Sequence, residues 1–324
     1  MEIKKILIIR SDRFGEFILN TPAIRAVKDK FPAASIVLMV SPVVKEIVEG
    51  WPIIDEVLTY PEDRLRGIWN LASEFRKRKF DLALILNPKK EFHIATFLAG
   101  IPLRFGYNRK FGALLSHKIE DRKHLGRQHE VEYNLDLVKA AGIDCQDKSL
   151  FVSFDREDEE TVNFALGRQG ISDADNIIAV HPWTSDAVKQ WPVEHFSQLA
   201  QRLIKEIYCR VAIIGGNAEI GFAQDFCKDK TGLINMAGKL TLRQLAAFLR
   251  RCRLLVSNDS GPVHMAAAVG TPVVALFRGD LPGKNAQRWG PWGQGHIVIE
   301  KNNFYEITVD EVFSKVKEVL KRGL

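Results

Sequence analysis

The stretch Lys5–Glu16, which reads KILIIRSDRFGE, decides the fold class of this chain. Its apolar residues Ile6–Ile9 do not alternate with polar ones, and such continuous runs are typical of parallel strands covered on both faces. A polar loop follows at once, and ligands of open α/β sheets bind at the carboxyl ends of strands. The stretch therefore predicts an α/β domain with a candidate site directly after its first strand.

Short apolar runs alternate with longer amphipathic segments along the whole chain. The expected strands are Lys5–Arg10, Ser35–Val40, Glu56–Tyr60, Asp81–Asn87, Arg104–Tyr107, Asn176–His181, Cys209–Gly215, Leu233–Met236, Leu254–Asn258, Val273–Phe277 and His296–Ile299. The expected helices include Phe17–Lys30, Val193–Lys205, Leu242–Arg251, Val263–Val269 and Thr308–Leu324. Thr21-Pro22 falls inside the first of these and is expected to interrupt it. Repeated strand–helix–strand units in a chain of 324 residues predict two open α/β domains.

The expected domain boundary lies within Asp155–Ala174. This segment begins with the acidic group Glu157–Glu160 and ends just before a new apolar strand. The acidic group is typical of a solvated helix start, because negative charge is favourable near a helix N-terminus. The sequence thus predicts an N-terminal domain over residues 1–165 and a C-terminal domain over residues 166–324.

Composition and charge exclude several classes of protein. With 46% hydrophobic and 27% charged residues, the chain is too apolar for disorder, and its charges are too well mixed for a coiled coil. Residues 1–150 hold 25 Lys+Arg against 20 Asp+Glu, whereas residues 151–324 hold 21 against 20. The first half is therefore expected to meet an anionic partner. No nucleic-acid partner is expected, because the second half is nearly neutral and has no basic aromatic stripe.

The sequence carries no targeting, membrane or metal signal. The run Ile6–Ile9 is shorter than the roughly 7 to 15 residues of a signal-peptide core, and no stretch reaches the about 18 apolar residues of a membrane span. Cys145, Cys209, Cys227 and Cys252 form no Cys-x-x-Cys pair, which fits a reducing cytoplasm and argues against zinc or disulfides. We expect a cytoplasmic protein with no metal site.

The loop after the first strand holds two carboxylates four residues apart, Asp12 and Glu16. Either can serve as a general base, and Gly15 permits a tight turn or the close approach of a ligand. Helix capping by Ser11 or Asp12, with Glu16 in the first turn, is the alternative. The Gly-x-Gly-x-x-Gly fingerprint is missing, so a nicotinamide-dependent oxidoreductase is not expected.

The loop after the first strand of the second half, residues 181–192, lies in the equivalent place. Thr184 and Ser185 offer hydroxyl groups there, and Lys189 offers a positive charge suited to phosphate oxygens. A structural loop with a solvated lysine is the alternative. Trp191-Pro192 opens the next expected helix.

A third loop, residues 258–264, connects a strand to an alanine-rich helix. Asp259 or Ser260 can cap that helix, and backbone N–H groups at Ser260 and Gly261 suit an anion. His264 follows one step further in and is either a functional side chain or a packed one. Beyond Gly215-Gly216, Glu219 can accept hydrogen bonds from ribose hydroxyls or simply place charge in a first helical turn.

In this order, the three loops resemble glycosyltransferase family 9, the lipopolysaccharide heptosyltransferases. The family's opening loop, which ends in Gly-Asp, is matched by Gly15-Glu16 and the later Thr21-Pro22. Its lysine before Trp-Pro is matched by Lys189-Gln190-Trp191-Pro192. Its most specific motif is matched by Ser257–Ala268, followed by Gly270-Thr271-Pro272. The resemblance covers about Lys5 to Phe277.

This resemblance implies the GT-B architecture, two Rossmann-like α/β domains facing across a cleft, with the last helix returning toward the N-terminal domain. The C-terminal domain of such proteins holds a nucleotide-diphosphate sugar, ADP-heptose in the family. The N-terminal domain receives a lipid-linked or lipopolysaccharide-core saccharide at the cytoplasmic face of the inner membrane, which implies peripheral contact with that membrane. The positive charge of residues 1–150 suits an acceptor that carries phosphates and acidic sugars.

The family's reaction is a single inverting displacement that needs no metal and no cofactor. The resemblance places the catalytic base at Glu16, a departure from the family's aspartate, with Asp12 in reserve. It assigns Thr184, Ser185, Lys189, Ser260, Gly261 and His264 to the donor diphosphate, and Asp259 and Glu219 to the sugar and ribose. Two alternatives remain: a related transferase using another nucleotide sugar, and a nucleotide-binding module whose catalytic base is impaired.

Overall fold

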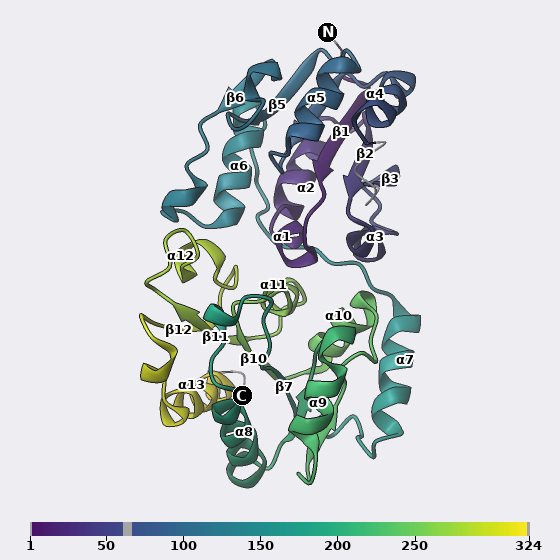
Figure 1. Ribbon diagram of the computed structural model, residues 1–324. Coiled ribbons are helices and arrows are strands. Elements are labelled where there is room, and N and C mark those ends of the chain that lie inside the picture. Colours follow the sequence, from purple (N-terminus) through teal and green to yellow (C-terminus); the bar gives the residue numbers. More distant parts are fainter. Residues whose placement is uncertain (1, 61–66, 323–324) are drawn as a thin grey trace. The chain divides into compact units, whose positions relative to one another are not determined.

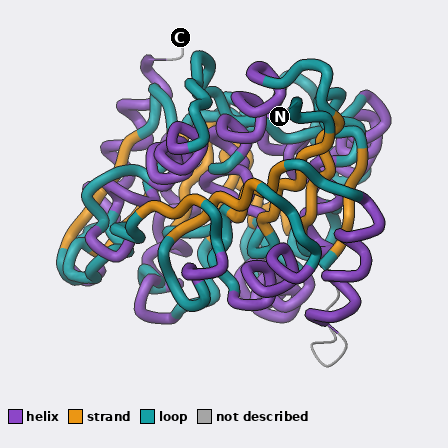
Figure 2. The backbone as a smooth tube through the Cα atoms, turned by 90° about the horizontal axis from the view of Figure 1, so that it is seen from above, coloured by secondary structure: helices purple, strands orange, loops and turns teal. Residues whose placement is uncertain are grey.

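The computed structural model describes residues 2–60 and 67–322, which fall into two compact units, Met1–Ser153 and Phe154–Leu324. The units divide after Ser153, whereas the sequence places the division after residue 165. Helix α7 (Arg156–Gly167) lies between these two positions and packs against α10 of the second unit. Each unit is an α/β layer structure of its own. In Figure 2 the strands run between layers of helices.

The first unit is built on a six-stranded sheet in the order β3-β2-β1-β4-β5-β6, in which every pair of neighbours is parallel. Its strands are β1 (Lys5–Arg10), β2 (Ser35–Val40), β3 (Glu56–Thr59), β4 (Leu82–Ile85), β5 (Leu103–Tyr107) and β6 (His117–Ile119). Ile6–Ile9 are fully buried. The prediction of a central parallel strand from this apolar run is therefore confirmed.

Helices cover the first sheet, as the purple-to-blue part of Figure 1 shows. They are α1 (Phe14–Ile18), α2 (Thr21–Lys30), α3 (Pro42–Val48), α4 (Gly67–Arg78), α5 (Lys90–Leu98) and α6 (Glu130–Ala140), with short 3-10 turns η2 (Gly112–Leu114) and η3 (Lys123–Leu125). Phe75 and Phe92 lie in the hydrophobic core between α4, α5 and the sheet.

The second unit repeats this design with the order β12-β11-β10-β7-β8-β9, again with parallel neighbours throughout. Its strands are β7 (Ile177–His181), β8 (Arg210–Ile213), β9 (Leu233–Asn235), β10 (Leu254–Asn258), β11 (Val273–Arg278) and β12 (Ile297–Lys301). Its helices are α7, α8 (Val193–Arg202), α9 (Ile220–Cys227), α10 (Leu242–Arg251), α11 (Gly261–Ala268), α12 (Ala286–Trp289) and α13 (Val309–Arg322), with the shorter η4 (Ala187–Lys189), η5 (Leu203–Ile207), η6 (Asn217–Glu219) and η7 (Phe304–Glu306).

The buried Trp191 centres the core of the second unit. Its indole N–H donates to the Ile307 carbonyl at 2.9 Å, and its ring meets that of Phe196 edge-on. This ties the start of α8 to the segment before α13, which packs on α8 and on β10 to β12. The sequence predicts the last helix over Thr308–Leu324, and residues 323 and 324 lie outside the described part. Its return toward the N-terminal domain stays a prediction.

Two sequence predictions of secondary structure need comment. The helical pattern over Phe17–Lys30 is divided into α1 and α2, and the interruption expected at Thr21-Pro22 is confirmed, because Pro22 has no N–H to continue a helix and instead occupies the first turn of α2. Strand β6 was not expected, because it has three residues, stands at the sheet edge and is exposed at two of its three positions. Most other elements agree within one or two residues.

Each sheet has one place where the chain changes direction across it. Strand β1 lies between β2 and β4, and β7 lies between β8 and β10. The chain leaves β1 toward β2 and later crosses back from β3 to β4, and it leaves β7 toward β8 and crosses back from β9 to β10. The carboxyl ends of β1 and β7 are therefore the topological switch points, where ligands of such sheets bind. The polar loops singled out in the sequence follow β1, β7 and β10.

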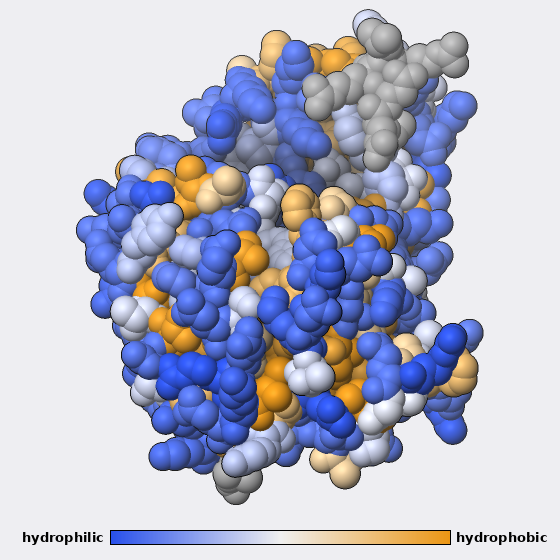
Figure 3. Space-filling view, turned by 60° about the horizontal axis from the view of Figure 1, so that its bottom comes forward, coloured by the Kyte–Doolittle hydropathy of each residue, from blue (hydrophilic) through white to orange (hydrophobic). Residues whose placement is uncertain are grey.

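The surface is mixed rather than apolar. Hydrophilic side chains dominate the face shown in Figure 3, and the hydrophobic ones form small separate areas among them. Single exposed apolar residues of this kind are normal on folded proteins. No helix among the described residues is long and apolar enough to span a membrane.

Candidate active site

Arg10, the last residue of β1, organises the candidate site of the first unit. Only 4% of its side chain is exposed. Its Nε donates to Asp12 Oδ1 at 2.7 Å and its Nη1 to the Leu86 carbonyl at 3.1 Å, while its Nη2 lies 3.8 Å from Glu16 Oε2. One buried cation thus faces both carboxylates predicted from the sequence, so the structure brings Asp12 and Glu16 together.

Glu16 lies in the short helix α1, one position after the buried Gly15. The pKa of its carboxyl is raised to about 7: burial is the largest cause, the negative charge of Asp12 and a hydrogen bond with Asp12 add to it, and the charges of Arg10 and Arg13 oppose it. A carboxyl with a pKa near the working pH can hold or release a proton there, which is what a general base requires. Of the capping alternative, only the place of Glu16 in the first turn of α1 is confirmed; neither Ser11 nor Asp12 caps the helix, since its N-cap residue is Arg13, whose side chain makes no cap hydrogen bond.

In the second unit, Lys189 and Asp259 form an ion pair that joins the loop after β7 to the loop after β10. Asn258, which is fully buried, joins the same loops a second time. Its side-chain amide donates to the Pro182 carbonyl at 2.8 Å, and its side-chain oxygen accepts from the backbone N–H of Trp191 at 2.9 Å. Two motifs about seventy residues apart in the sequence are therefore held together in the structure.

His181 belongs to this cluster and was given no role from the sequence. It pairs with Ser257 across β7 and β10, and its Nδ1 lies 3.1 Å from Ser260 Oγ, which in turn is 2.8 Å from Ser257 Oγ. Burial lowers the pKa of His181 to about 4, so its ring is neutral at neutral pH. The sequence signal, a histidine ending a strand, has meaning only once β7 and β10 are known to be neighbours.

The start of α11 shows the consequence of this contact. Ser260 is the N-cap residue of α11, yet its side chain makes no cap hydrogen bond, because the hydroxyl is turned to His181 and Ser257. Gly261 and Pro262 form the first turn, and His264 is buried within the helix beside Trp289, with ring centroids 6.4 Å apart. The helix dipole at this end favours an anion.

A cavity of about 720 Å³ lies between α8 and α9 in the second unit. Thr184 and Glu219 both line it, together with the rings of Trp183, Phe222 and Phe226. Glu219 accepts a hydrogen bond from the Gly216 N–H at 2.7 Å, which fixes its side chain at the start of α9. The cavity thus brings Thr184 and Glu219 together, while Ser185 is exposed in the loop next to Thr184.

The four cysteines are free thiols. Among residues 2–60 and 67–322, no three His, Cys, Asp or Glu side chains are grouped as ligands for a metal ion. The groups at the sites are carboxylates paired with arginine and lysine, the neutral His181, the buried His264, and hydroxyls. This arrangement can bind an anion in the second unit and exchange a proton in the first.

Each unit has a parallel sheet with helices on both faces and polar loops at the carboxyl ends of its central strands, which is the arrangement of a two-unit α/β protein with a ligand-binding edge in each unit. Residues 68–315 match the family model described as glycosyltransferase family 9 (heptosyltransferase). The chain belongs to glycosyltransferase family 9, and it is a glycosyltransferase. The match begins after the loop that holds Asp12 and Glu16.

Individual relatives agree with this assignment. Lipopolysaccharide heptosyltransferase 2 of Escherichia coli strain K12 is 24% identical over 294 residues, which is 86% of this chain and 84% of that protein. Among solved structures, the glycosyl transferase family 9 protein of Veillonella parvula DSM 2008 has a TM-score of 0.89 at 21% identity, over 99% of both chains. The E. coli ADP-heptose lps heptosyltransferase II has a TM-score of 0.83 at 21% identity, over 98% of this chain and 99% of that one. The fold is accordingly of the GT-B class.

Proposed function

We propose that this glycosyltransferase moves heptose from ADP-heptose onto a lipopolysaccharide-core saccharide, with inversion at the anomeric carbon and without a metal ion. The names of the relatives support the donor and acceptor. The observation that carries the proposal is the joined pair of loops after β7 and β10, in which Lys189, Asp259 and the start of α11 lie together.

The donor diphosphate binds to the second unit in this proposal. Lys189 supplies positive charge, and Ser260 and Gly261 present backbone N–H groups at the start of α11. His264 lies in the first turns of the same helix, and Thr184 and Ser185 add hydroxyl groups. These groups also stabilise the charge that develops on the departing ADP. Asp259 receives sugar hydroxyls, and Glu219 receives those of the ribose.

The base comes from the first unit. Glu16 takes the proton from an acceptor hydroxyl, the freed oxygen forms a bond to the anomeric carbon, and the bond from that carbon to the ADP oxygen breaks. Because attack and departure occur on opposite faces in one step, the configuration at the anomeric carbon inverts. Arg10 keeps one of the two neighbouring carboxylates ionised, so that the Asp12–Glu16 pair can accept the proton.

The acceptor is proposed to bind to the first unit, whose residues 1–150 carry more positive than negative charge. A phosphorylated, acidic saccharide complements that charge. We place the enzyme in the cytoplasm, in peripheral contact with the inner membrane where its lipid-linked acceptor is anchored.

A thermal-shift series with ADP, UDP, GDP, CMP and their sugar conjugates tests the donor. A ligand that binds only the folded state adds about 2.7 kcal/mol of stability at a hundred times its dissociation constant. ADP and ADP-heptose should therefore raise the unfolding temperature, whereas the other nucleotides should not. A shift with another nucleotide would favour the related transferase, and no shift with any would contradict the proposal.

Substitution of Lys189 localises the donor. Lys189→Ala should weaken ADP binding about tenfold or more in calorimetry, since a charge-assisted contact to a phosphate contributes about 1.5 to 3 kcal/mol. Lys228→Ala, which removes an exposed lysine at the end of α9, is the control and should bind ADP normally. Binding of ADP without any transfer or hydrolysis of ADP-heptose would instead favour the impaired binding module.

A further inference from the structure

Lys123 and Glu130 form a buried ion pair that the proposed mechanism does not use. Lys123 lies in η3 and Glu130 is the first residue of α6. Their side chains are 10% and 1% exposed, and Lys123 Nζ donates to Glu130 Oε1 at 2.6 Å. A buried ion pair is weak evidence for stability, because desolvation of both charges offsets their attraction. Its presence beside the candidate site therefore calls for another explanation.

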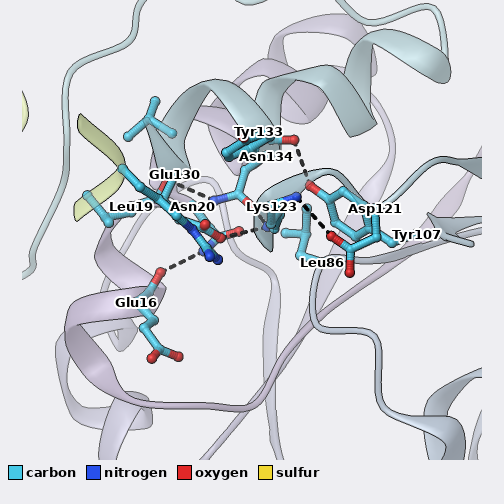
Figure 4. A network of polar contacts seen from close by, with 12 residues as sticks. Glu16, Leu19, Asn20, Leu86, Tyr107, Asp121, Lys123, Glu130, Tyr133 and Asn134 are labelled. Carbon is cyan, nitrogen blue, oxygen red and sulfur yellow. Dashed lines mark hydrogen bonds and ion pairs between the residues drawn. The ribbon is translucent and has the colours of Figure 1, made fainter. Parts of the chain in front are cut away.

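The pair is held by several neighbours. Lys123 Nζ also donates to Asn134 Oδ1 at 2.8 Å and lies 4.5 Å from the centre of the Tyr107 ring. Tyr107 itself is fixed by a 2.6 Å hydrogen bond from its hydroxyl to the Tyr133 carbonyl. Figure 4 shows Lys123, Glu130 and Asn134 gathered beside Tyr107, with the carboxylate of Glu16 turned away from this group.

Glu130 connects the pair to the site. Its Oε1 lies 3.7 Å from Arg10 Nη1, on the side of the guanidinium opposite to the contacts with Asp12 and Glu16. The charges therefore alternate along one line, from Lys123 through Glu130 and Arg10 to the two site carboxylates. This line holds two cations and three carboxylates, so it is neutral only when one proton is bound.

We propose that Glu130 and Lys123 are positioning residues for the Asp12–Glu16 pair: Glu130 orients the guanidinium of Arg10, and Lys123 neutralises Glu130 so that Arg10 is left to the site. Without Lys123, Glu130 would draw Arg10 toward α6. Without Glu130, the full charge of Arg10 would act on the site. This inference rests on the proposed function for its catalytic meaning, but its electrostatic part concerns the folded protein alone.

Other charged and titratable groups lie near the site, but each has contacts of its own. Arg13 acts on Glu16 directly from the same loop. Lys89, at the start of α5, donates to Ser11 Oγ at 3.0 Å, and Asp121 accepts from the backbone N–H of Lys123 at 3.2 Å. The Tyr107 hydroxyl stays protonated, since burial raises its pKa well above the ordinary value. None of these groups separates Glu130 from Arg10.

The test is a pH titration of Glu16 in the full chain. The titration is monitored by NMR of carboxyl-labelled glutamate, and the Glu16 signal is assigned by its absence in Glu16→Gln. Glu130→Gln should move the Glu16 midpoint down, and Lys123→Met should move it up, each by about half a pH unit or more. The acid limb of the pH–rate profile should move with it. The double variant K123M/E130Q should return the midpoint close to that of the unchanged protein, because both opposing charges are gone.

A matched control uses the same helix. Glu132 of α6 is half-buried and forms a 2.8 Å contact with the exposed Lys148, so Lys148→Met and Glu132→Gln remove the same residue types without reaching Arg10. They should leave the Glu16 midpoint unchanged. A purely structural role for Lys123 and Glu130 would lower stability without moving the midpoint in opposite directions, and that result would overturn the proposal.

A second measurement uses the unsubstituted protein, so it does not depend on whether the variants fold. As pH passes the Glu16 midpoint, the side-chain nitrogen resonances of Arg10 and of Lys123 should both shift with that same midpoint. A Lys123 resonance that stays constant while Arg10 follows Glu16 would overturn the proposal. Because neither titration requires transfer activity, failure of the proposed enzyme function would be seen separately, as intact titration without catalysis.

Discussion

The resemblance to the family predicts that Glu16 stands where the family has an aspartate. A glutamate reaches one methylene further, and displacement of a reacting group by about 1 Å can reduce a rate on the order of a hundredfold. In this chain Arg10 contacts both Asp12 and Glu16. The site therefore keeps a carboxylate that can act as base and a cation that holds it in place.

The pH dependence of turnover follows from the pKa of Glu16. A general base works only when ionised, and the pKa of Glu16 is raised to about 7. Activity should therefore fall as pH drops through 7, and reach a plateau above about pH 8. Glu16→Gln should lower kcat by about 10²- to 10⁴-fold and leave ADP affinity nearly unchanged. Full activity in Glu16→Gln together with loss in Asp12→Asn would reassign the base to Asp12.

The same carboxyl should lower stability at neutral pH. Its folded pKa of about 7 lies above the ordinary value of 4.5, so between these values the folded state keeps a proton that the unfolded chain has lost. Stability from this group therefore falls as pH rises from 4.5 to 7 and stays lower above. Glu16→Gln removes the effect and should gain on the order of 2 kcal/mol at pH 8, and almost nothing near pH 4. Urea unfolding at both pH values measures it, with Glu132→Gln as control.

At the scale of elements, the loops after β7 and β10 act as one part because Asn258 bridges them. Its side chain accepts a hydrogen bond from the backbone N–H of Trp191 and donates one to the Pro182 carbonyl, and all of these groups are buried. His181, Ser257 and Ser260 make a second connection at the start of α11. The anion-binding end of α11 is thus held against the loop that carries Lys189.

Asn258→Ala should break this connection. Two buried backbone groups would lose their partners, at about 1 to 3 kcal/mol each, so the free energy of unfolding should fall by about 2 to 5 kcal/mol. ADP affinity should fall as well, because Lys189 and α11 lose their common support. Asn303→Ala, which removes one exposed cap contact to the Tyr305 N–H, is the control and should cost about 1 kcal/mol with normal ADP binding. Normal ADP affinity in folded Asn258→Ala would show that the bridge is dispensable.

At the scale of the whole molecule, each unit has a sheet and a core of its own. All residues proposed for the donor belong to the second unit, and both candidate bases belong to the first. The division of chemistry thus follows the division of the chain. Repetition of one α/β design places a ligand-binding edge in each unit, where the two can be specialised separately.

Hydrogen exchange of the full protein with ADP should show this division. Protection should appear at residues 181–192 and 258–264, where backbone groups meet the diphosphate in the proposal, and should be absent from residues 10–16. UMP at the same concentration serves as the control ligand. Protection confined to residues 10–16 would place the nucleotide in the wrong unit and contradict the donor assignment.

The sequence alone determined the α/β class, the two sheets, most strand positions and the loops that carry polar groups. This was possible because a continuous apolar run is itself the signature of a buried parallel strand, and residues 5–10, 35–40 and 254–258 needed no further context. The family followed from the order and spacing of motifs. Edge strand β6 has only three residues and no continuous apolar run, so its local signal is too weak to predict it.

Only the tertiary structure decided which of these residues act together. The strand order places β10 beside β7 and β4 beside β1, so contacts such as Lys189 with Asp259, His181 with Ser260, and Arg10 with the Leu86 carbonyl join residues that are distant in the chain. The burial that raises the pKa of Glu16, and the line from Lys123 to Arg10, depend on the same packing. Local pattern fixes what a segment becomes, whereas electrostatics depends on distance and burial, and these exist only in the folded chain.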